Sequence, residues 1–323
     1  GLIVDGSGSE PYSGDIGINA DTIAAIGDLT TFSGSIELDA EGKAITPGFI
    51  NMLSWAPGDL MKDGRSMGDI VQGVTLEVFG EGWSEGPLTE EMKSSEYAAN
   101  NRPEWTTLRE FLDVLETQGI STNVASFIGA TTVRVHEVGY EDRAPTNDEL
   151  QRMKALVRQA MEEGAMGIGT SLIYAPAFYA STQELIELSR VAAEYDGMYI
   201  SHMRSEGNQL LEALEELITI SREAGIRAEV YHLKAGGESN WHKMDLAIAR
   251  IEEARASGLH ITADMYTYVA GATGLDAHMP PWVQEGGFGA WRERLMDPDI
   301  RANVLQEMRT PTNEWENLGL GAG

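Results

Sequence analysis

The sequence predicts an α/β fold, a (β/α)8 barrel of the TIM type that is incomplete before its last strand and follows a small β segment. From about residue 45 onward, short apolar runs alternate with long helical patterns at a spacing of about 30 residues, which indicates parallel βαβ units. Residues 1–44 hold only short strand candidates separated by turn residues. An open doubly wound sheet fits the same alternation, but no glycine-rich phosphate-binding motif follows the first strand, which disfavours that alternative.

The predicted elements follow one another in a regular order along the larger part of the chain. Thr146 and Ser181 each precede a helical pattern with Glu three residues later, the arrangement of a capping box. Residues 280–323 contain several Pro and Gly residues and are expected to form a loop or insertion with a helix near 299–308. The predicted strands are 45–50, 74–79, 122–128, 164–170, 197–201, 227–231 and 260–265. The predicted helices are 146–163, 182–195, 208–224 and 243–257.

Composition excludes several classes of function. The 323 residues are 42% hydrophobic and carry a formal net charge of -28, so the chain is expected to bind neither nucleic acid nor an anionic membrane. It contains no cysteine, which excludes disulfides and thiolate chemistry. No signal peptide is visible after Gly1, so the compartment stays open, with the cytoplasm slightly favoured. The oligomeric state is not predicted.

Two histidines stand at matching ends of successive strands. In a parallel barrel the side chains at the carboxyl ends of the strands converge on one mouth, where active sites lie. His202 follows the strand at 197–201, and His232 follows the strand at 227–231. Glu81, after the strand at 74–79, adds a carboxylate. Two histidines with one glutamate form a known catalytic zinc set that leaves one position open for water, although each residue has an alternative structural interpretation.

Other polar residues near the strand ends have two interpretations each. Tyr174 and Tyr266 could donate a hydrogen bond to a developing oxyanion, or simply pack. Arg204 and Lys234 could meet a carboxylate of the substrate or of the metal site, or form ion pairs in the barrel wall. Asp264 could support a histidine. A nucleophilic serine is not expected, because no G-x-S-x-G motif occurs. The remaining histidines are expected to be background: His136, His242, His260 and His278.

Several segments together resemble one protein family. The chain is similar to the amidohydrolase superfamily, and within it to the D-aminoacylase (N-acyl-D-amino-acid deacylase) branch. The resemblance covers essentially the whole chain and is specific for the family, though not for the substrate. The segments that carry it are Gly42–Ile50 (GKAITPGFI), Gly80–Ser84 (GEGWS), Ser171–Tyr174 (SLIY), Ser201–Gly207 (SHMRSEG), His232–Lys234 (HLK) and Asp264–Tyr268 (DMYTY).

This resemblance implies roles for individual residues. In that family the two strand-end histidines ligate zinc, which implies His202 and His232 here, while Glu81 stands where the family has a ligating cysteine. Tyrosines matching Tyr174 and Tyr266 lie near the substrate. The resemblance also implies that residues 1–44 are the N-terminal part of a small β-sandwich domain, and that residues 45–323 are a metal-dependent amidohydrolase barrel, incomplete at its C-terminus.

The chain departs from the family pattern in ways that bear on mechanism. Leu53 and Trp55 occupy the positions of the family's H-x-H pair, so one zinc ion is expected in preference to two. The family's catalytic aspartate lies on the last barrel strand, which is expected beyond Gly323. No catalytic general base is therefore assigned, and residues 1–323 alone are expected to be inactive.

The expected function is zinc-dependent hydrolysis of a linear amide bond, and specifically deacylation of N-acyl-D-amino acids. The expected partner is a small-molecule amide substrate. One alternative is a dipeptidase or another amide hydrolase. A second alternative is a non-catalytic ligand-binding barrel that has lost its H-x-H metal pair.

Overall fold

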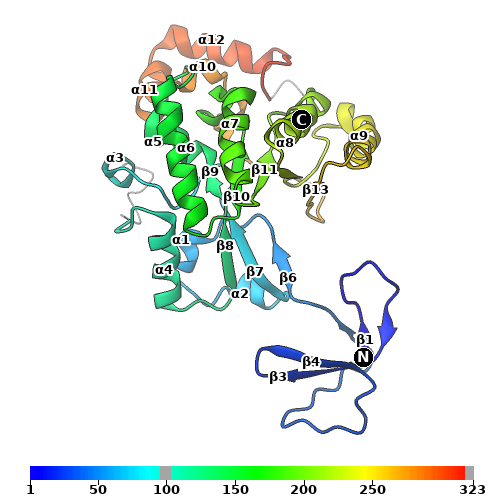
Figure 1. Ribbon diagram of the computed structural model, residues 1–323. Helices are drawn as coiled ribbons and strands as arrows, with labels where there is room; N and C mark the ends of the chain where they lie inside the picture. The colour runs from blue at the N-terminus through cyan, green and yellow to red at the C-terminus, as the bar shows by residue number, and fades with distance from the viewer. Residues whose placement is uncertain (95–102, 317–323) are drawn as a thin grey trace.

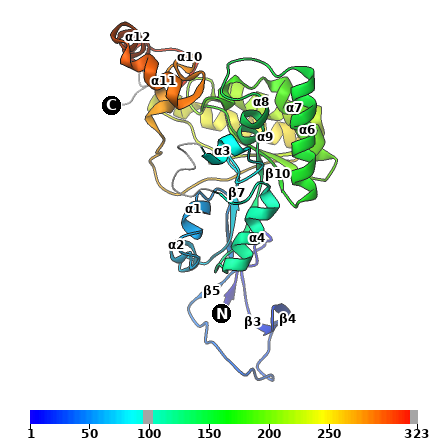
Figure 2. The same ribbon diagram turned by 90° about the vertical axis from the view of Figure 1, so that its left-hand side faces the viewer.

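The computed structural model describes residues 1–94 and 103–316 of the chain. It begins with short strands: β1 (Leu2–Ile3), β2 (Tyr12–Ser13), β3 (Asp15–Asn19), β4 (Thr22–Gly27) and β5 (Ala44–Ile45). Strand β1 pairs with β2 antiparallel and with β5 parallel, and β3 and β4 form an antiparallel hairpin. Both ribbon views show these strands lying apart from the helices that follow (Figures 1 and 2).

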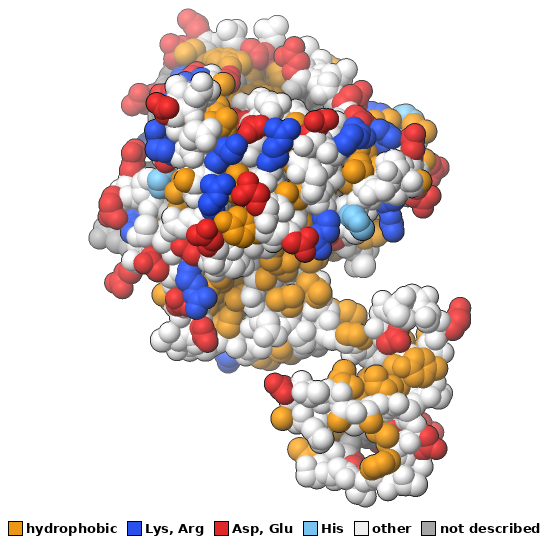
Figure 3. Space-filling view, viewed as in Figure 1, with side chains coloured by type: hydrophobic (Ala, Val, Ile, Leu, Met, Phe, Trp, Pro, Cys, Tyr) orange, Lys and Arg blue, Asp and Glu red, His pale blue; other side chains and the backbone are white. Residues whose placement is uncertain are grey.

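The N-terminal strands bury little apolar surface. Ile3 is buried, but most of the large apolar side chains in this segment are exposed, and Leu38 reaches 88%. Figure 3 shows hydrophobic side chains gathered on the surface of this segment. The exposed large apolar residues between positions 18 and 38 are Ile18, Ile23, Ile26, Phe32, Ile36 and Leu38.

The larger part of the chain is built on parallel strands in sequence order. They are β6 (Phe49–Asn51), β7 (Val74–Phe79), β8 (Asn123–Ser126), β9 (Ile128–Gly129), β10 (Gly167–Ser171), β11 (Met198–His202), β12 (Arg227–Val230) and β13 (Ile261–Ala263). One sheet has the order β6-β7-β8 and the other the order β9-β10-β11-β12-β13, with every pairing parallel. Six of the seven predicted strands are confirmed in position. The prediction of one strand at 45–50 was wrong, because Ile45 pairs with β1 in the N-terminal sheet and only β6 pairs with β7.

The predicted strand at 122–128 divides at Phe127. Up to Ser126 the chain pairs with β7, and from Ile128 it pairs with β10. The two sheets therefore meet through one residue and form a continuous row. The prediction of a barrel is borne out only in its α/β alternation, because no pairing of β6 with β13 closes the row within the described residues.

Helices alternate with these strands and cover one side of them (Figure 1). The four predicted helices are confirmed as α6, α7, α8 and α9. In the segment predicted as a loop or insertion, the helix expected near 299–308 is confirmed as α12, and α10 and α11 precede it. Residues 317–323 of that prediction lie outside the described residues. None of the described helices has the length and apolar character needed to span a membrane. The helix bounds are α1 (Pro57–Leu60), α2 (Met67–Ile70), α3 (Glu90–Ser94), α4 (Leu108–Gln118), α5 (Ala130–Glu137), α6 (Asn147–Glu162), α7 (Thr182–Ala193), α8 (Leu210–Ala224), α9 (Met244–Ala256), α10 (Pro281–Gln284), α11 (Gly287–Met296) and α12 (Pro298–Arg309), with 3-10 turns at Ala177–Tyr179, Glu238–Lys243 and Leu275–His278.

Helix α6 begins with a reciprocal capping box. The Thr146 hydroxyl accepts a hydrogen bond from the Glu149 backbone N–H at 3.3 Å, and the Glu149 carboxylate accepts one from the Thr146 N–H at 2.6 Å. We expect Thr146→Ala to lower the free energy of unfolding by about 1 kcal/mol, as measured by urea denaturation. Thr146→Ser keeps the hydroxyl and is the matched control, so an equal loss in both variants would contradict this role of the cap.

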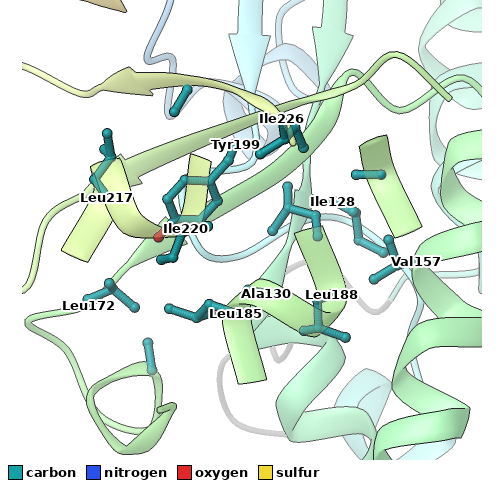
Figure 4. Close-up of a cluster of buried hydrophobic side chains, with 14 of the residues drawn as sticks. Ile128, Ala130, Val157, Leu172, Leu185, Leu188, Tyr199, Leu217, Ile220 and Ile226 are labelled. Carbon is teal, nitrogen blue, oxygen red and sulfur yellow. The ribbon is translucent and has the colours of Figure 1, made fainter. Parts of the chain in front are cut away.

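The side chains of the strands alternate between two apolar layers. Tyr199 faces the helices, where a core lies between strands and helices (Figure 4). Ile200 faces the opposite, inner side, where it packs with Val78, Phe127 and Tyr231. Because His202 is two residues beyond Ile200, it lies on the same inner face. The main core includes Ile128, Val157, Leu185, Leu188, Leu217 and Ile220.

Candidate metal centre

Two glycines place Glu81 against the neighbouring strands. Glu81 stands between Gly80 and Gly82, just after β7. Both glycines have positive φ, at 102° and 71°, a conformation that favours glycine. A Cβ on Gly80 would lie 2.3 Å from the Phe127 carbonyl oxygen, and one on Gly82 would lie 2.0 Å from Ser171 Oγ. The backbone can approach this closely only without side chains, which brings the Glu81 carboxylate to the strand ends.

A change in backbone direction turns His232 toward the same point. It directly follows the inward-facing Tyr231, so simple alternation would point it to the other side. Strand β12 ends at Val230, however, and His232 has a φ of 38°, which is uncommon for a residue with a side chain. The Asp264 carboxylate accepts a hydrogen bond from the His232 backbone N–H at 2.7 Å and stabilises this turn. Asp264 thus supports the backbone of His232, whereas the sequence suggested support of a histidine without fixing the atom.

The structure brings the three predicted metal-binding residues together. Glu81, His202 and His232 are all buried, and one potential ligand atom from each lies within 4.8 Å of the others. Glu81 Oε1 lies 2.9 Å from His202 Nδ1 and 3.4 Å from His232 Nε2. The two imidazole rings are 4.6 Å apart between centroids and nearly perpendicular, at 88°.

The donor set of these residues fits zinc. Two imidazole nitrogens and one carboxylate oxygen are ligands that zinc takes in catalytic sites with an open fourth position. Because Glu81 Oε1 faces Nδ1 of His202 and Nε2 of His232, these are the atoms that would hold the ion. Within residues 1–94 and 103–316, no other group of three such side chains has this spacing.

Glu206 also belongs to this cluster, although the sequence analysis did not select it. Its Oε1 lies 2.9 Å from His232 Nδ1 and 3.8 Å from His202 Nε2. Lys234 donates a hydrogen bond to the same oxygen at 2.6 Å. Glu206 is in the segment SHMRSEG, four residues after His202, but no regular structure there made the contact predictable, since α8 begins only at Leu210.

The carboxylates and imidazoles of the cluster shift one another's proton affinities. Burial disfavours the charged form of His232, but hydrogen bonds to Glu206 and Glu81 outweigh it and raise the pKa of the ring to about 9. Burial would raise the pKa of Glu206, yet contact with His232 and the charges of His202 and Lys234 lower it to about 2. Despite burial, the histidines likewise lower the pKa of Glu81. The site therefore holds two ionised carboxylates.

Both predicted tyrosines lie beside the cluster. The ring of Tyr174 is 5.4 Å from that of His202 in an edge arrangement, and its hydroxyl is hydrogen bonded to Thr273 Oγ1 at 2.7 Å. Burial raises the pKa of Tyr174 to about 12, which keeps the phenol protonated near neutral pH. The Tyr266 ring is 6.4 Å from that of His232 and stacks on Tyr268. One open cavity of about 2210 Å³ is lined by Tyr174, Tyr266 and Tyr268 together with His202 and His232.

Arg204 fixes the loop that carries Tyr174. Its guanidinium donates two hydrogen bonds to the Glu216 carboxylate, both at 2.9 Å. It also donates to the carbonyl oxygens of Phe178 at 2.8 Å and Ala180 at 2.9 Å. Of the interpretations that the sequence allowed, Arg204 therefore forms an ion pair in the wall, while Lys234 meets a carboxylate of the candidate site.

The positions of the missing H-x-H pair lie at the edge of the cavity. Leu53 packs against the inner apolar layer, whereas Trp55 is 61% exposed, and both line the cavity. Neither side chain carries a metal-ligating atom. Between them, Ser54 donates a hydrogen bond to the buried Glu77 at 2.7 Å, which anchors this turn to β7.

Comparison with known proteins adds evolutionary evidence, although no family model matches the chain. A D-aminoacylase from Alcaligenes xylosoxydans xylosoxydans is 33% identical over 279 residues, which are 85% of this chain and 57% of the relative. An N-acyl-D-glutamate deacylase from the same organism is 32% identical, over 84% of this chain and 57% of the relative. The chain thus spans little more than half the length of the curated relatives it matches.

Solved structures of the same kinds of enzyme also align with this chain. The crystal structure of a D-aminoacylase that defines a novel subset of amidohydrolases aligns with a TM-score of 0.76 at 34% identity, over 84% of this chain and 58% of that one. An N-acyl-D-glutamate deacylase from Bordetella bronchiseptica, complexed with zinc and a phosphonate that mimics the tetrahedral intermediate, aligns at 0.75 and 31% identity, over 83% and 57%. Another D-aminoacylase structure describes a binuclear metal centre with one-metal activation and second-metal attenuation. It aligns with a TM-score of 0.76 at 33% identity, over 84% of this chain and 58% of that one.

Proposed function

The chain is a relative of the D-aminoacylases within the amidohydrolases, and from this premise we propose that it carries the metal site of an enzyme that deacylates N-acyl-D-amino acids. One observation carries the proposal: Glu81, His202 and His232 meet at the strand ends with one ligand atom each within 4.8 Å. The printed activities and the zinc–phosphonate complex of the aligned relatives support the choice of amide hydrolysis.

The finer architecture is part of the same proposal. The seven parallel strand positions would belong to a (β/α)8 barrel, and residues 1–44 to the N-terminal part of a small β-sandwich domain. The outer edges of β6 and β13 have no strand partner among the described residues. Phe49 and Ile50 on β6 are each 55% exposed, so this edge of the strand row presents apolar surface.

Each residue of the site has a proposed role. His202, His232 and Glu81 would hold one zinc ion, since Leu53 and Trp55 offer no ligand for a second. When bound, zinc polarises the amide carbonyl and makes water a stronger nucleophile. Tyr174, a protonated phenol near neutral pH, would donate a hydrogen bond to the developing oxyanion. Tyr266 would contact the substrate, and no general base is assigned among the described residues.

Tyr174→Phe tests the proposed oxyanion contact. Loss of a hydrogen bond to a charged group costs about 1.5–3 kcal/mol, so we expect kcat to fall roughly 10- to 150-fold with little change in KM. Thr273→Val is the matched control, because it removes the partner of the Tyr174 hydroxyl but keeps the phenol. Equal losses in the two variants would show that the hydrogen bond acts structurally.

The complete gene product that contains this chain should be tested for turnover and metal content together. The assay would measure release of free amino acid from paired N-acetyl-D- and N-acetyl-L-amino acids, with zinc determined on the same sample. Turnover of the D series with about one zinc per chain is the expected result. Bound zinc with cleavage of dipeptides or other amides instead would indicate a different amide hydrolase.

A non-catalytic ligand-binding barrel is the second candidate function, and it is favoured by Leu53 and Trp55 in place of metal-binding residues. The same assay separates it from the first. A purified protein that neither retains zinc nor cleaves any substrate in the panel would support this candidate and refute the proposed deacylase.

A further inference from the structure

The outer nitrogens of both histidines face one carboxylate oxygen. His202 presents Nδ1 to Glu81, which leaves Nε2 on the far side of its ring, and His232 presents Nε2, which leaves Nδ1. Glu206 Oε1 lies 2.9 Å from that Nδ1 and 3.8 Å from that Nε2. His202 Nε2 is buried and has no hydrogen-bond partner, so Glu206 is placed to accept a proton from His232 Nδ1 and only to lie near the ring of His202.

We propose that Glu206 is a positioning residue that fixes the tautomer of His232, and thereby raises the affinity of the site for zinc. An imidazole binds metal through an unprotonated nitrogen, and the hydrogen bond made by its other nitrogen decides which one that is. Carboxylates in this position also orient the ring and increase its basicity. This inference rests on the proposed metal site and adds a residue outside its three ligands.

Lys234 and Glu206 together favour the tautomer of His232 that carries its proton on Nδ1. Its Nζ lies 2.6 Å from Glu206 Oε1 and 2.8 Å from His232 Nδ1. If Nδ1 carried no proton, Lys234 could donate to it, and the proton on Nε2 would then block the metal position beside Glu81. With the proton on Nδ1, the ring donates to Glu206, Lys234 donates to the same carboxylate, and Nε2 is free to bind. Glu206 satisfies both donors only in the second state.

The position of Glu206 is itself well defined. Its side chain is 17% exposed, and its backbone carbonyl accepts a hydrogen bond from the Gly236 N–H at 2.6 Å. This backbone contact ties the loop after β11 to the loop after β12, which carry His202 and His232. Glu206 therefore approaches both rings from a fixed point.

Zinc affinity of the complete protein tests the proposal without an activity assay. Affinity would be measured by competition with a chromophoric chelator for the wild type, Glu206→Gln, Glu206→Ala and the control Glu212→Gln. Glu212 is exposed on the first turn of α8 and loses the same charge. Removal of such a carboxylate lowers metal affinity by about 10- to 100-fold, so we expect the lower end for Gln, the upper end for Ala, and no change for Glu212→Gln.

A second measurement reads the tautomers directly. The chain has six histidines, so ¹⁵N-histidine spectra of the metal-free protein, recorded at a pH above the pKa of His232 (about 9), can be assigned with single variants. We expect the proton on His232 Nδ1 in the wild type, and a mixed or reversed pattern for His232 in Glu206→Gln, a result that stands even if Glu206→Ala fails to fold.

The outcomes are distinct. Equal zinc affinity in wild type and both Glu206 variants, with unchanged tautomers, would overturn the inference while leaving the metal site intact. A change in the number of oxygen ligands by X-ray absorption in Glu206→Gln would also overturn it, because Glu206 would then be a ligand itself. A wild type that binds no zinc would refute the proposed function and this inference together.

Discussion

Replacing His202 with alanine is expected to weaken zinc binding by about 100- to 1000-fold. Structural zinc sites gain roughly 10–16 kcal/mol from about four ligands, or about 2.5–4 kcal/mol per ligand, and 1.4 kcal/mol corresponds to tenfold. His202 is one of three described side chains around the candidate position, so its loss leaves only His232 and Glu81. Chelator competition measures the affinity, and zinc remaining after dialysis gives the stoichiometry.

His242→Ala is the matched control for this experiment. His242 is an exposed histidine in a 3-10 turn and lies outside the cluster, so its replacement should leave zinc affinity unchanged. If His202→Ala bound zinc as tightly as His242→Ala, the ion would be held elsewhere and the assignment of the site would be wrong.

The second large effect is expected at a buried ion pair that is not part of the candidate metal site. Arg134 on α5 donates two hydrogen bonds from Nη1 to the Glu184 carboxylate of α7, at 3.0 and 2.7 Å. Only 1% of the arginine side chain and 3% of the glutamate side chain are exposed. Burial raises the pKa of Glu184 in spite of the opposing charge of Arg134, which shows how strongly the interior disfavours the bare carboxylate.

Arg134→Met is therefore expected to lower the free energy of unfolding by about 3–5 kcal/mol, since it leaves Glu184 buried without its partner. It also removes the donors that Nη2 supplies to the carbonyl oxygens of Glu141 and Arg143. Chemical denaturation with two spectroscopic probes measures the change. The double variant Arg134→Met/Glu184→Leu should recover much of the loss, because a pair of apolar residues needs no charge compensation. A single variant as stable as the wild type would refute this account.

The strands and their carboxyl ends were predictable because the signals are local. Apolar runs such as 74–79 and 197–201 have the length and spacing of buried parallel strands. Because the carboxyl ends of parallel strands converge, the sequence alone predicts that Glu81, His202 and His232 lie close together. The sequence analysis did not predict helix α4. Its capping box, formed by Thr107 and Glu110, is nevertheless a pattern that the sequence contains.

Other parts of the site depend on contacts that a linear pattern does not contain. Glu206 lies in a loop, and its position depends on the bond between its carbonyl and the Gly236 N–H. The split of one predicted strand at Phe127 depends on two different neighbours, β7 and β10. Arg204 could be read as a substrate contact until the carbonyl oxygens of Phe178 and Ala180 were found beside it. These features arise from tertiary packing.

The carboxylate at position 81 has a chemical consequence for the durability of the centre. The chain has no cysteine, so a site built on Glu81, His202 and His232 contains no sulfur. Thiolate ligands are oxidised by peroxide to sulfenic and higher acids, and the higher acids are irreversible. A metal bound only by nitrogen and oxygen atoms is not released by that chemistry. Peroxide treatment that strips zinc from thiolate-ligated sites should leave this centre loaded.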